Sequence, residues 1–258
     1  MTPMARYLET ELADFGITEV QIRVETSSVG MISALQSNEV DLYFDSPLVA
    51  AHVARSAGAV PFLRRWKRGE ASYHSLIIVP TDSDIHDLRD LVGQRIGFQE
   101  PDSTSGFLLP VDMLLDARLP LRELVDRTEN PDEDEIGYVF TEDDKNTLLW
   151  LARGWIAAGA TDPRRWAQLN EARPGAFRII ATSVEVPRQV VVRRGGLDAA
   201  LSLRISDVLQ DMSENEETSE ILEQFHKTSR FDEFPRGVAG TFDPIYTLLD
   251  RLAAADLI

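Results

Sequence analysis

Short apolar runs with the two-residue period of strands alternate with segments of helical period along this chain. Val40–Phe44 and Gln94–Gln99 are typical strands, and residues with helical spacing follow them as far as Val53 and Ala117. Such alternation predicts an α/β fold in which helices connect the strands of a parallel sheet.

The same pattern favours two lobes, with both ends of the chain in the first. We expect residues 1–77 and 192–258 to form lobe 1, and residues 78–191 to form lobe 2. The apolar runs Leu76–Val79 and Gln189–Val192 would then be the two strands in which the chain crosses between the lobes.

Three local patterns add detail. Val20–Val24 alternates in the manner of a strand, and a helix is expected from about Ser28. The basic run Arg64–Arg68, interrupted only by Trp66, predicts a solvated loop. Asp126–Glu135 is acidic and polar and contains a proline, which indicates an exposed loop.

The charge and the composition exclude several classes of protein. A formal net charge of −17 argues against binding to nucleic acid or to anionic membranes, because both require clustered Lys and Arg. There is no cysteine, and no run of about 20 apolar residues that could cross a bilayer. The first residues lack a basic stretch followed by an apolar one, so no secretory signal is expected in the sequence as given.

Polar residues collect where predicted strands pass into helices. Helix N-termini carry unpaired N–H groups and a partial positive charge, so these junctions are candidate anion sites. The candidate residues at these junctions are Ser27 and Ser28, Ser46, the run Ser103, Thr104, Ser105 and Gly106, and Asp144 within Thr141–Asp144. Tyr73 begins a buried strand and is added as a residue that could face a ligand.

Ordinary helix capping explains most of these junctions equally well, since Ser, Thr and Asp are preferred N-caps. Ser103–Gly106 differs, because three consecutive hydroxyls and a glycine exceed what a cap requires. The four histidines have no metal-ligand spacing, and no nucleophile–base pair is evident. We therefore expect no metal, no cofactor and no enzymatic activity; an enzyme on this scaffold is the least favoured alternative.

Several segments resemble, in the same order, motifs of the substrate-binding proteins of phosphate, phosphite and phosphonate ABC transporters. Val40–Pro47 resembles "VDxxFxGP", Tyr73–Val79 resembles "YxSxIVV", and Asp87–Phe98 resembles "SLxDLKGKxFAF". Pro101–Pro110 resembles "DPxSTSGxLxP", the most specific of these motifs, and Gly154–Asp162 resembles "GxVDAAAxD".

The resemblance implies a class II periplasmic-binding-protein fold, with a ligand cleft between two lobes joined by a two-strand hinge. It also implies a small phosphoryl-type anion as ligand, an ABC permease as partner and a periplasmic location. The family's site residues carry over to Ser103, Thr104, Ser105 and Gly106, with Tyr73 lining the site and Asp162 closing a matching strand. We expect a monomer.

Two departures alter the expected site. Val29 stands where the family has a tyrosine, and Asp144 stands where it has a histidine, with Lys145 beside it. Either Lys145 supplies the cation, or the ligand carries a positive group that meets Asp144, or the ligand is not a phosphonate. The family's first strand and its leader have no counterpart in the sequence as given, so a ligand-sensing module or a cytoplasmic homologue stays an alternative.

Overall fold

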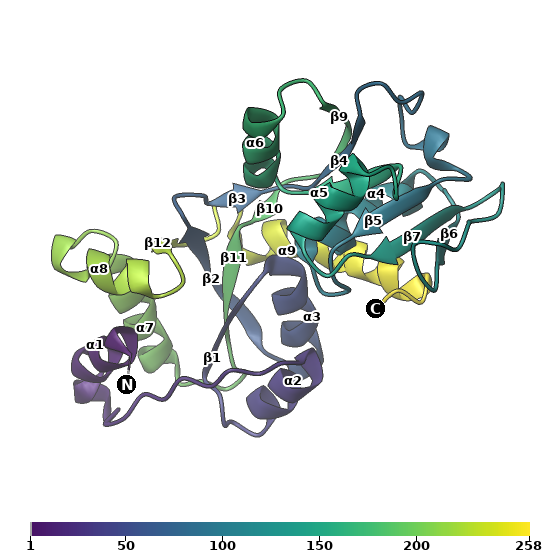
Figure 1. Ribbon diagram of the computed structural model, residues 1–258. Coiled ribbons are helices and arrows are strands. Elements are labelled where there is room, and N and C mark those ends of the chain that lie inside the picture. Colours follow the sequence, from purple (N-terminus) through teal and green to yellow (C-terminus); the bar gives the residue numbers. More distant parts are fainter. Residues whose placement is uncertain (1) are drawn as a thin grey trace. The chain divides into compact units, whose positions relative to one another are not determined.

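A four-stranded and a six-stranded sheet organise the two units into which residues 2–258, the part described by this computed structural model, divide (Figure 1). Unit 1 comprises the stretch that ends at Ser72 together with Pro187–Tyr246. Unit 2 comprises Tyr73–Val186 and Thr247–Ile258. The unit boundaries thus precede the predicted lobe boundaries at 77/78 and 191/192, and the last turns of the long helix α9 (Gly237–Ala254) belong to unit 2.

The sheet of unit 1 has the order β1-β11-β2-β12, and every neighbouring pair is antiparallel. Its strands are β1 (Leu42–Asp45), β11 (Gln189–Arg193), β2 (Val60–Lys67) and β12 (Thr228–Asp232). The predicted parallel sheet is therefore wrong for this unit. β1 and β2 still run in the same direction, because each is antiparallel to β11, which lies between them. A sequence pattern indicates that a helix links two strands, but not that a third strand separates them.

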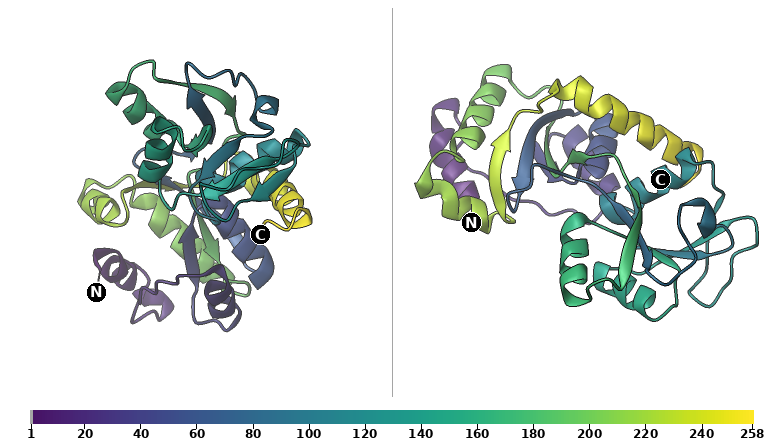
Figure 2. Two further views of the ribbon diagram at one scale, coloured as in Figure 1. Left: turned by 45° about the vertical axis from the view of Figure 1, so that its right-hand side comes forward. Right: turned by 90° about the horizontal axis from the view of Figure 1, so that it is seen from above.

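Helices of unit 1 bury apolar faces against this sheet. They are α1 (Pro3–Glu11), α2 (Ser28–Gln36), α3 (Pro47–Ala57), α7 (Ala199–Asp211) and α8 (Glu216–Gln224), with a short 3₁₀ turn, η1 (Ala13–Phe15). Thr2 caps α1 by accepting a hydrogen bond from the Ala5 amide. Leu8 of α1 packs in one core with Leu222 of α8 and Phe231 of β12, and Figure 2 shows α1 beside α8.

Two further predictions for unit 1 are wrong. Val20–Val24 is not a strand: it pairs with no other described segment, and Val24 is 83% exposed. The basic run is not a solvated loop, because most of it lies in β2. In β2 the buried positions alternate, and Arg65 continues the inward series of Pro61 and Leu63.

The sheet of unit 2 has the order β6-β7-β5-β8-β4-β9. Its strands are β6 (Leu121–Glu123), β7 (Ile136–Phe140), β5 (Arg95–Phe98), β8 (Ala158–Thr161), β4 (Leu76–Pro80) and β9 (Phe177–Thr182). The pairs from β6 to β8 are parallel, as predicted, whereas β4 is antiparallel to both of its neighbours. A short pair, β3 (Ser72–Tyr73) and β10 (Val186–Pro187), lies where the chain passes from one unit to the other.

The helices of unit 2 follow its strands. They are the 3₁₀ turn η2 (Arg89–Leu91), the π-helical turn η3 (Thr104–Leu108), α4 (Leu109–Asp116), α5 (Asp144–Ala152) and α6 (Pro163–Ala172). The predicted helix after Gln99 therefore begins as a π-turn before it becomes α-helical. Between β6 and β7, the predicted loop Asp126–Glu135 is free of helix and strand and is largely exposed.

Candidate functional site

Three helices begin at one edge of the sheet of unit 2. β7, β5 and β8 are neighbours and run parallel, so their carboxyl ends meet at the same edge. η3 with its continuation α4 follows β5, α5 follows β7, and α6 follows β8. In sheets of this kind, ligands bind beyond the carboxyl ends of the strands, where helix N-termini gather.

The turn after β5 is held by Ser103 and by a cluster of aromatic rings. The Ser103 hydroxyl accepts a hydrogen bond from the Gly106 amide at 3.1 Å and donates one to Gln99 Oε1 at 2.7 Å. Phe107 packs on Phe98 and Phe140, with ring centroids 5.3 and 5.0 Å apart. Ser103 is therefore a cap and a link to Gln99, and the rings fix the position of the whole turn.

Gly106 makes room for a side chain of the protein itself. A Cβ at this position would lie 2.4 Å from Cδ of Gln99, which is held by Ser103. The sequence alone does not indicate this contact. The glycine lets Gln99 reach across the turn.

Thr104 and Ser105 offer the unused donors of the turn. The Thr104 hydroxyl oxygen is buried and has no hydrogen-bond partner among residues 2–258. The Ser105 hydroxyl likewise has none there, while the Ser105 carbonyl accepts a hydrogen bond from the Ser75 hydroxyl at 2.6 Å. The amides of both residues belong to the first turn of a helix, where N–H groups lack intrahelical acceptors. Two hydroxyls and two amides can therefore donate to an oxyanion.

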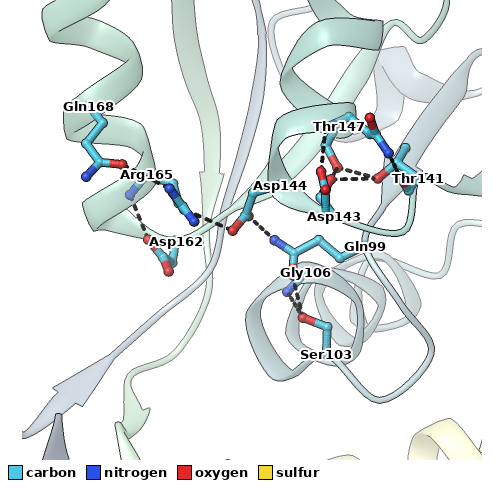
Figure 3. Close-up of polar contacts among 11 residues, drawn as sticks. Gln99, Ser103, Gly106, Thr141, Asp143, Asp144, Thr147, Asp162, Arg165 and Gln168 are labelled. Carbon is cyan, nitrogen blue, oxygen red and sulfur yellow. Dashed lines mark hydrogen bonds and ion pairs between the residues drawn. The ribbon is translucent and has the colours of Figure 1, made fainter. Parts of the chain in front are cut away.

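A chain of polar contacts connects the three strand ends (Figure 3). Gln99 donates from its amide to Asp144 Oδ1, and Arg165 donates from Nε to Asp144 Oδ2 at 3.1 Å. Asp162 caps α6 by accepting from the Arg165 amide at 2.7 Å. Asp144, on α5, is thus held between the turn after β5 and the first turn of α6.

Arg165 is the cation that meets Asp144. Burial raises the pKa of Asp144, the nearby Asp162 raises it further, and Arg165 opposes both effects. Lys145, which the sequence offers as a cation for the ligand, is exposed on α5. The negative charge of Asp144 is compensated within unit 2, although not fully.

The structure brings only some of the sequence candidates together. The residues that gather at this edge of unit 2 are Ser103, Thr104, Ser105, Gly106, Asp144 and Asp162. Tyr73 is buried at the start of unit 2. The remaining candidates belong to unit 1: Ser27 caps α2 by accepting from the Gly30 amide, Ser28 opens that helix, and Ser46 precedes α3 without a side-chain cap bond.

Sequence reasoning missed Gln99 and Arg165. Gln99 ends the predicted strand and directly follows β5, at a position where side chains point beyond the sheet edge. Arg165 lies three residues after the capping Asp162, on the first turn of its helix. The position of each residue relative to a strand end was a usable signal, but their joint contact with Asp144 depends on the strand order.

Two further observations limit the kinds of site present. Within residues 2–258, no three side chains of His, Cys, Asp or Glu are grouped so that they could hold a metal ion. Every helix in the same range is too short or too polar to span a bilayer.

The chain matches a known protein family over most of its length. A family described as "ABC transporter, phosphonate, periplasmic substrate-binding protein" matches residues 1–235. The phosphonates-binding periplasmic protein of Escherichia coli (strain K12) is 31% identical over 114 residues, which are 42% of this chain and 32% of that protein. The aligned part therefore spans about a third of that relative.

Solved structures extend the comparison to the whole fold. XAC2383 from Xanthomonas citri bound to ATP superposes with a TM-score of 0.91 at 25% identity, covering 98% of this chain and 93% of that one. PhnD1 from Prochlorococcus marinus (MIT 9301), in complex with methylphosphonate, gives a TM-score of 0.66 at 16% identity, covering 99% and 91%. The predicted α/β fold of class II periplasmic binding proteins is thereby confirmed.

Proposed function

Because this chain belongs to the family of periplasmic substrate-binding proteins of phosphonate ABC transporters, we propose that it binds a small phosphoryl-type oxyanion for import. The ligand class is a phosphonate, phosphite or phosphate. The proposal includes an ABC permease as partner, a place of action outside the cytoplasmic membrane, and binding as a monomer without turnover of the ligand.

One observation carries this proposal: the unused donors of Thr104 and Ser105. A buried hydroxyl without a partner loses its hydrogen bonds to water, and a ligand that accepts from it restores what is lost. Both hydroxyls belong to the start of a helix that continues through α4, where the helix dipole favours an anion. Tetrahedral oxyanions have enough acceptors to use all four donors.

The position of Asp144 predicts which oxyanion the chain binds more tightly. Its carboxylate lies in contact with Gln99, which also touches the turn, so it disfavours a second negative charge nearby. A zwitterionic ligand such as aminoethylphosphonate could place its ammonium group towards this carboxylate. We therefore expect aminoethylphosphonate to bind more tightly than methylphosphonate.

Isothermal titration calorimetry of the full chain with phosphate, phosphite, methylphosphonate and aminoethylphosphonate tests the proposal. Ser105→Ala is expected to weaken binding by about 1–3 kcal/mol, because a hydrogen bond to a charged ligand is lost. Ser202→Ala is the matched control: Ser202 is also buried and its hydroxyl also lacks a partner among residues 2–258, but it lies on α7 of unit 1. Equal affinity of both variants would contradict the proposed role of Ser105, and turnover of any ligand would contradict a purely binding function.

A ligand-sensing module is the second candidate, and the X. citri structure points to a nucleotide as a ligand to test for it. That protein is described as bound to ATP, which contains phosphoryl groups but is far larger than a phosphonate. ATP belongs in the same calorimetric series for this reason. Binding of ATP with no response to the four small oxyanions would favour sensing of a nucleotide over import of a phosphonate.

A further inference from the structure

Arg65 of β2 is a buried cation without a carboxylate partner. Its side chain is only 3% exposed. Nη2 donates to Gln189 Oε1 at 2.6 Å and Nη1 to the Thr228 hydroxyl at 3.3 Å, and both acceptors are neutral. Nε has no hydrogen-bond partner among residues 2–258, and no acidic group there lies within 4.0 Å of the guanidinium.

Arg64, the preceding residue, shows how the protein treats an arginine that serves only its structure. Arg64 lies on the opposite face of β2 and donates from Nε and Nη2 to the two carboxylate oxygens of Asp232, at 2.8 and 2.6 Å. Such two-pronged pairing is the usual environment of a partly buried arginine. The chain has 43 acidic residues, yet none of those described pairs with Arg65.

Other cations gather around Arg65. Lys67 lies two residues further on the same strand, and Arg188 precedes Gln189, the ladder partner of Arg65. Burial lowers the pKa of Lys67 to about 8, with Arg188 as the next largest cause, so these positive charges act on one another. Burial likewise lowers the pKa of Arg65 to about 10. Lys67 and Arg188 are half-buried, so both are more exposed to solvent than Arg65.

Two carboxylates lie near this group and offset its positive charge only in part. Asp45 accepts hydrogen bonds from the Tyr43 hydroxyl and from the Ser46 amide. Glu70 forms an ion pair with Arg188, with Nε and Oε2 at 3.2 Å. In a chain of net charge −17, unit 1 therefore holds an excess of positive charge at one place.

Burying an arginine without a counter-charge is unfavourable, because the protein replaces only part of its hydration. The unfavourable contribution is removed when an anion that accepts several hydrogen bonds enters the group. Guanidinium matches tetrahedral oxyanions because its donors form a planar fork, and two or more cations favour a doubly charged ligand.

We propose that Arg65, Lys67 and Arg188 form a binding site in unit 1 for a doubly charged tetrahedral oxyanion, such as phosphate or sulfate. The site stands on contacts within unit 1 alone. It holds or fails separately from the role proposed for Ser105.

Titration of the full chain with inorganic phosphate and with sulfate tests the site, using Arg65→Gln and the control Arg230→Gln. Arg230 is an exposed residue of β12 that lies over the Trp66 ring, so its replacement changes the net charge equally without removing a hydrogen bond of the group. Arg65→Gln is expected to weaken binding about 10- to 100-fold, since hydrogen bonds to a charged partner are lost. Arg230→Gln is expected to leave the affinity unchanged.

A second readout separates a binding role from a structural one. If Arg65 is held in place for an anion, Arg65→Gln leaves the unfolding temperature of the ligand-free protein unchanged or raises it by about 2–4 °C. A purely structural arginine gives the opposite result, a lower unfolding temperature with unchanged affinity. Arg65→Lys, which keeps the charge but loses the fork, is expected to bind with intermediate affinity.

Ser105→Ala in the same titrations distinguishes the two proposals. Loss of binding in Arg65→Gln but not in Ser105→Ala supports the site in unit 1 and contradicts the role of Ser105. The reverse result contradicts the site in unit 1 and leaves the proposed function standing. Failure of the unaltered chain to bind either phosphate or sulfate contradicts the site in unit 1 as well.

Discussion

The polar network around Asp144 in unit 2 and the group of cations around Arg65 in unit 1 differ in how far their charges are paired. In unit 2, Asp144 pairs with Arg165, and Asp162 accepts a hydrogen bond from a helix amide. The charges of this network are largely neutralised, and its unused groups are hydroxyls and amides. In unit 1, Arg65 and Lys67 form no ion pair with an acidic residue among residues 2–258, and the charge of Asp45 offsets theirs only in part. The difference teaches that a compensated network fixes the position of donors, whereas an uncompensated group leaves its charge available to an anion.

The largest effect is expected from Arg64, the compensated neighbour of Arg65. Arg64→Met leaves the Asp232 carboxylate, which is 18% exposed, without its cation. The free energy of unfolding is expected to fall by about 2–4 kcal/mol, because one partner of a mostly buried ion pair is removed. Urea unfolding of this variant beside Arg65→Gln measures the comparison directly, and similar losses in both would remove the distinction between the two arginines.

Gly106→Ala tests how tightly the network of unit 2 is packed. The added Cβ would clash with the Gln99 side chain. The amide oxygen of Gln99 accepts a hydrogen bond from Ser103, and its amide nitrogen donates one to Asp144. The variant is expected to lose about 1–3 kcal/mol of unfolding free energy through overpacking. Gly154→Ala is a poor control because of its positive φ, whereas Gly240→Ala, in α9, has only a contact of 3.1 Å with Arg236 Cβ to relieve. Equal losses in Gly106→Ala and Gly240→Ala would show that Gln99 moves aside freely.

Asp144→Asn tests how complete the compensation in unit 2 is. The raised pKa of Asp144 means that its ionised form is favoured less in the folded than in the unfolded chain. Its contribution to stability is therefore present at low pH and is lost as pH rises through the folded pKa, above the ordinary value of 3.8. Asp144→Asn is expected to be more stable than the unaltered chain at neutral pH by about 0.5–1 kcal/mol, and not at pH 3. Thermal unfolding as a function of pH measures this, and a lower stability of the variant at neutral pH would contradict the sign.

The smallest effect concerns the pH dependence of anion binding in unit 1. The charged and titratable groups around Lys67 are Arg65, Arg68, Arg188, His226, Asp45 and Glu70. Because the pKa of Lys67 is about 8, its positive charge is lost as pH rises through that value, and affinity falls. Sulfate suits the measurement since its charge stays constant. We expect a loss of about threefold between pH 7 and 9, which converts to ~0.7 kcal/mol.

Lys67→Met is the control for that measurement. The pKa of His226 is lowered by burial from 6.5, so this residue is neutral throughout the range and does not contribute. The affinity of Lys67→Met for sulfate is expected to be lower at pH 7 and constant up to pH 9. A variant that kept the full pH dependence would assign it to another group.

Local pattern predicts the strand Gln94–Gln99, the helix after it and the Ser103–Gly106 turn between them, because short motifs fix turns and caps locally. Local pattern does not identify Arg165 as the partner of Asp144, because their contact depends on β5 lying between β7 and β8. Val20–Val24 has the composition of a strand, but a strand needs a neighbour to pair with, which no local pattern supplies.

Arg65 is a residue that the loop prediction for the basic run places wrongly. The charge of the basic run favours a loop, although Pro61, Leu63 and Arg65 share one phase of a two-residue period. The two-residue period places Arg65 on the inward face of the strand, whereas only its charge favours exposure to solvent. A charged residue in an apolar phase was therefore the sequence signal of the group described in unit 1.

The position of β11 between β1 and β2 has a consequence for folding of the chain during its synthesis. Residues 42–67 leave the ribosome long before Gln189–Arg193, so β1 and β2 must wait, with unpaired edges, while all of Tyr73–Val186 is synthesised. That intervening stretch can complete the six-stranded sheet, whose strands all lie within it, during the delay. The nascent chain is thus most exposed to aggregation at its first-made strands, and a chaperone that covers them would act before residue 189 emerges.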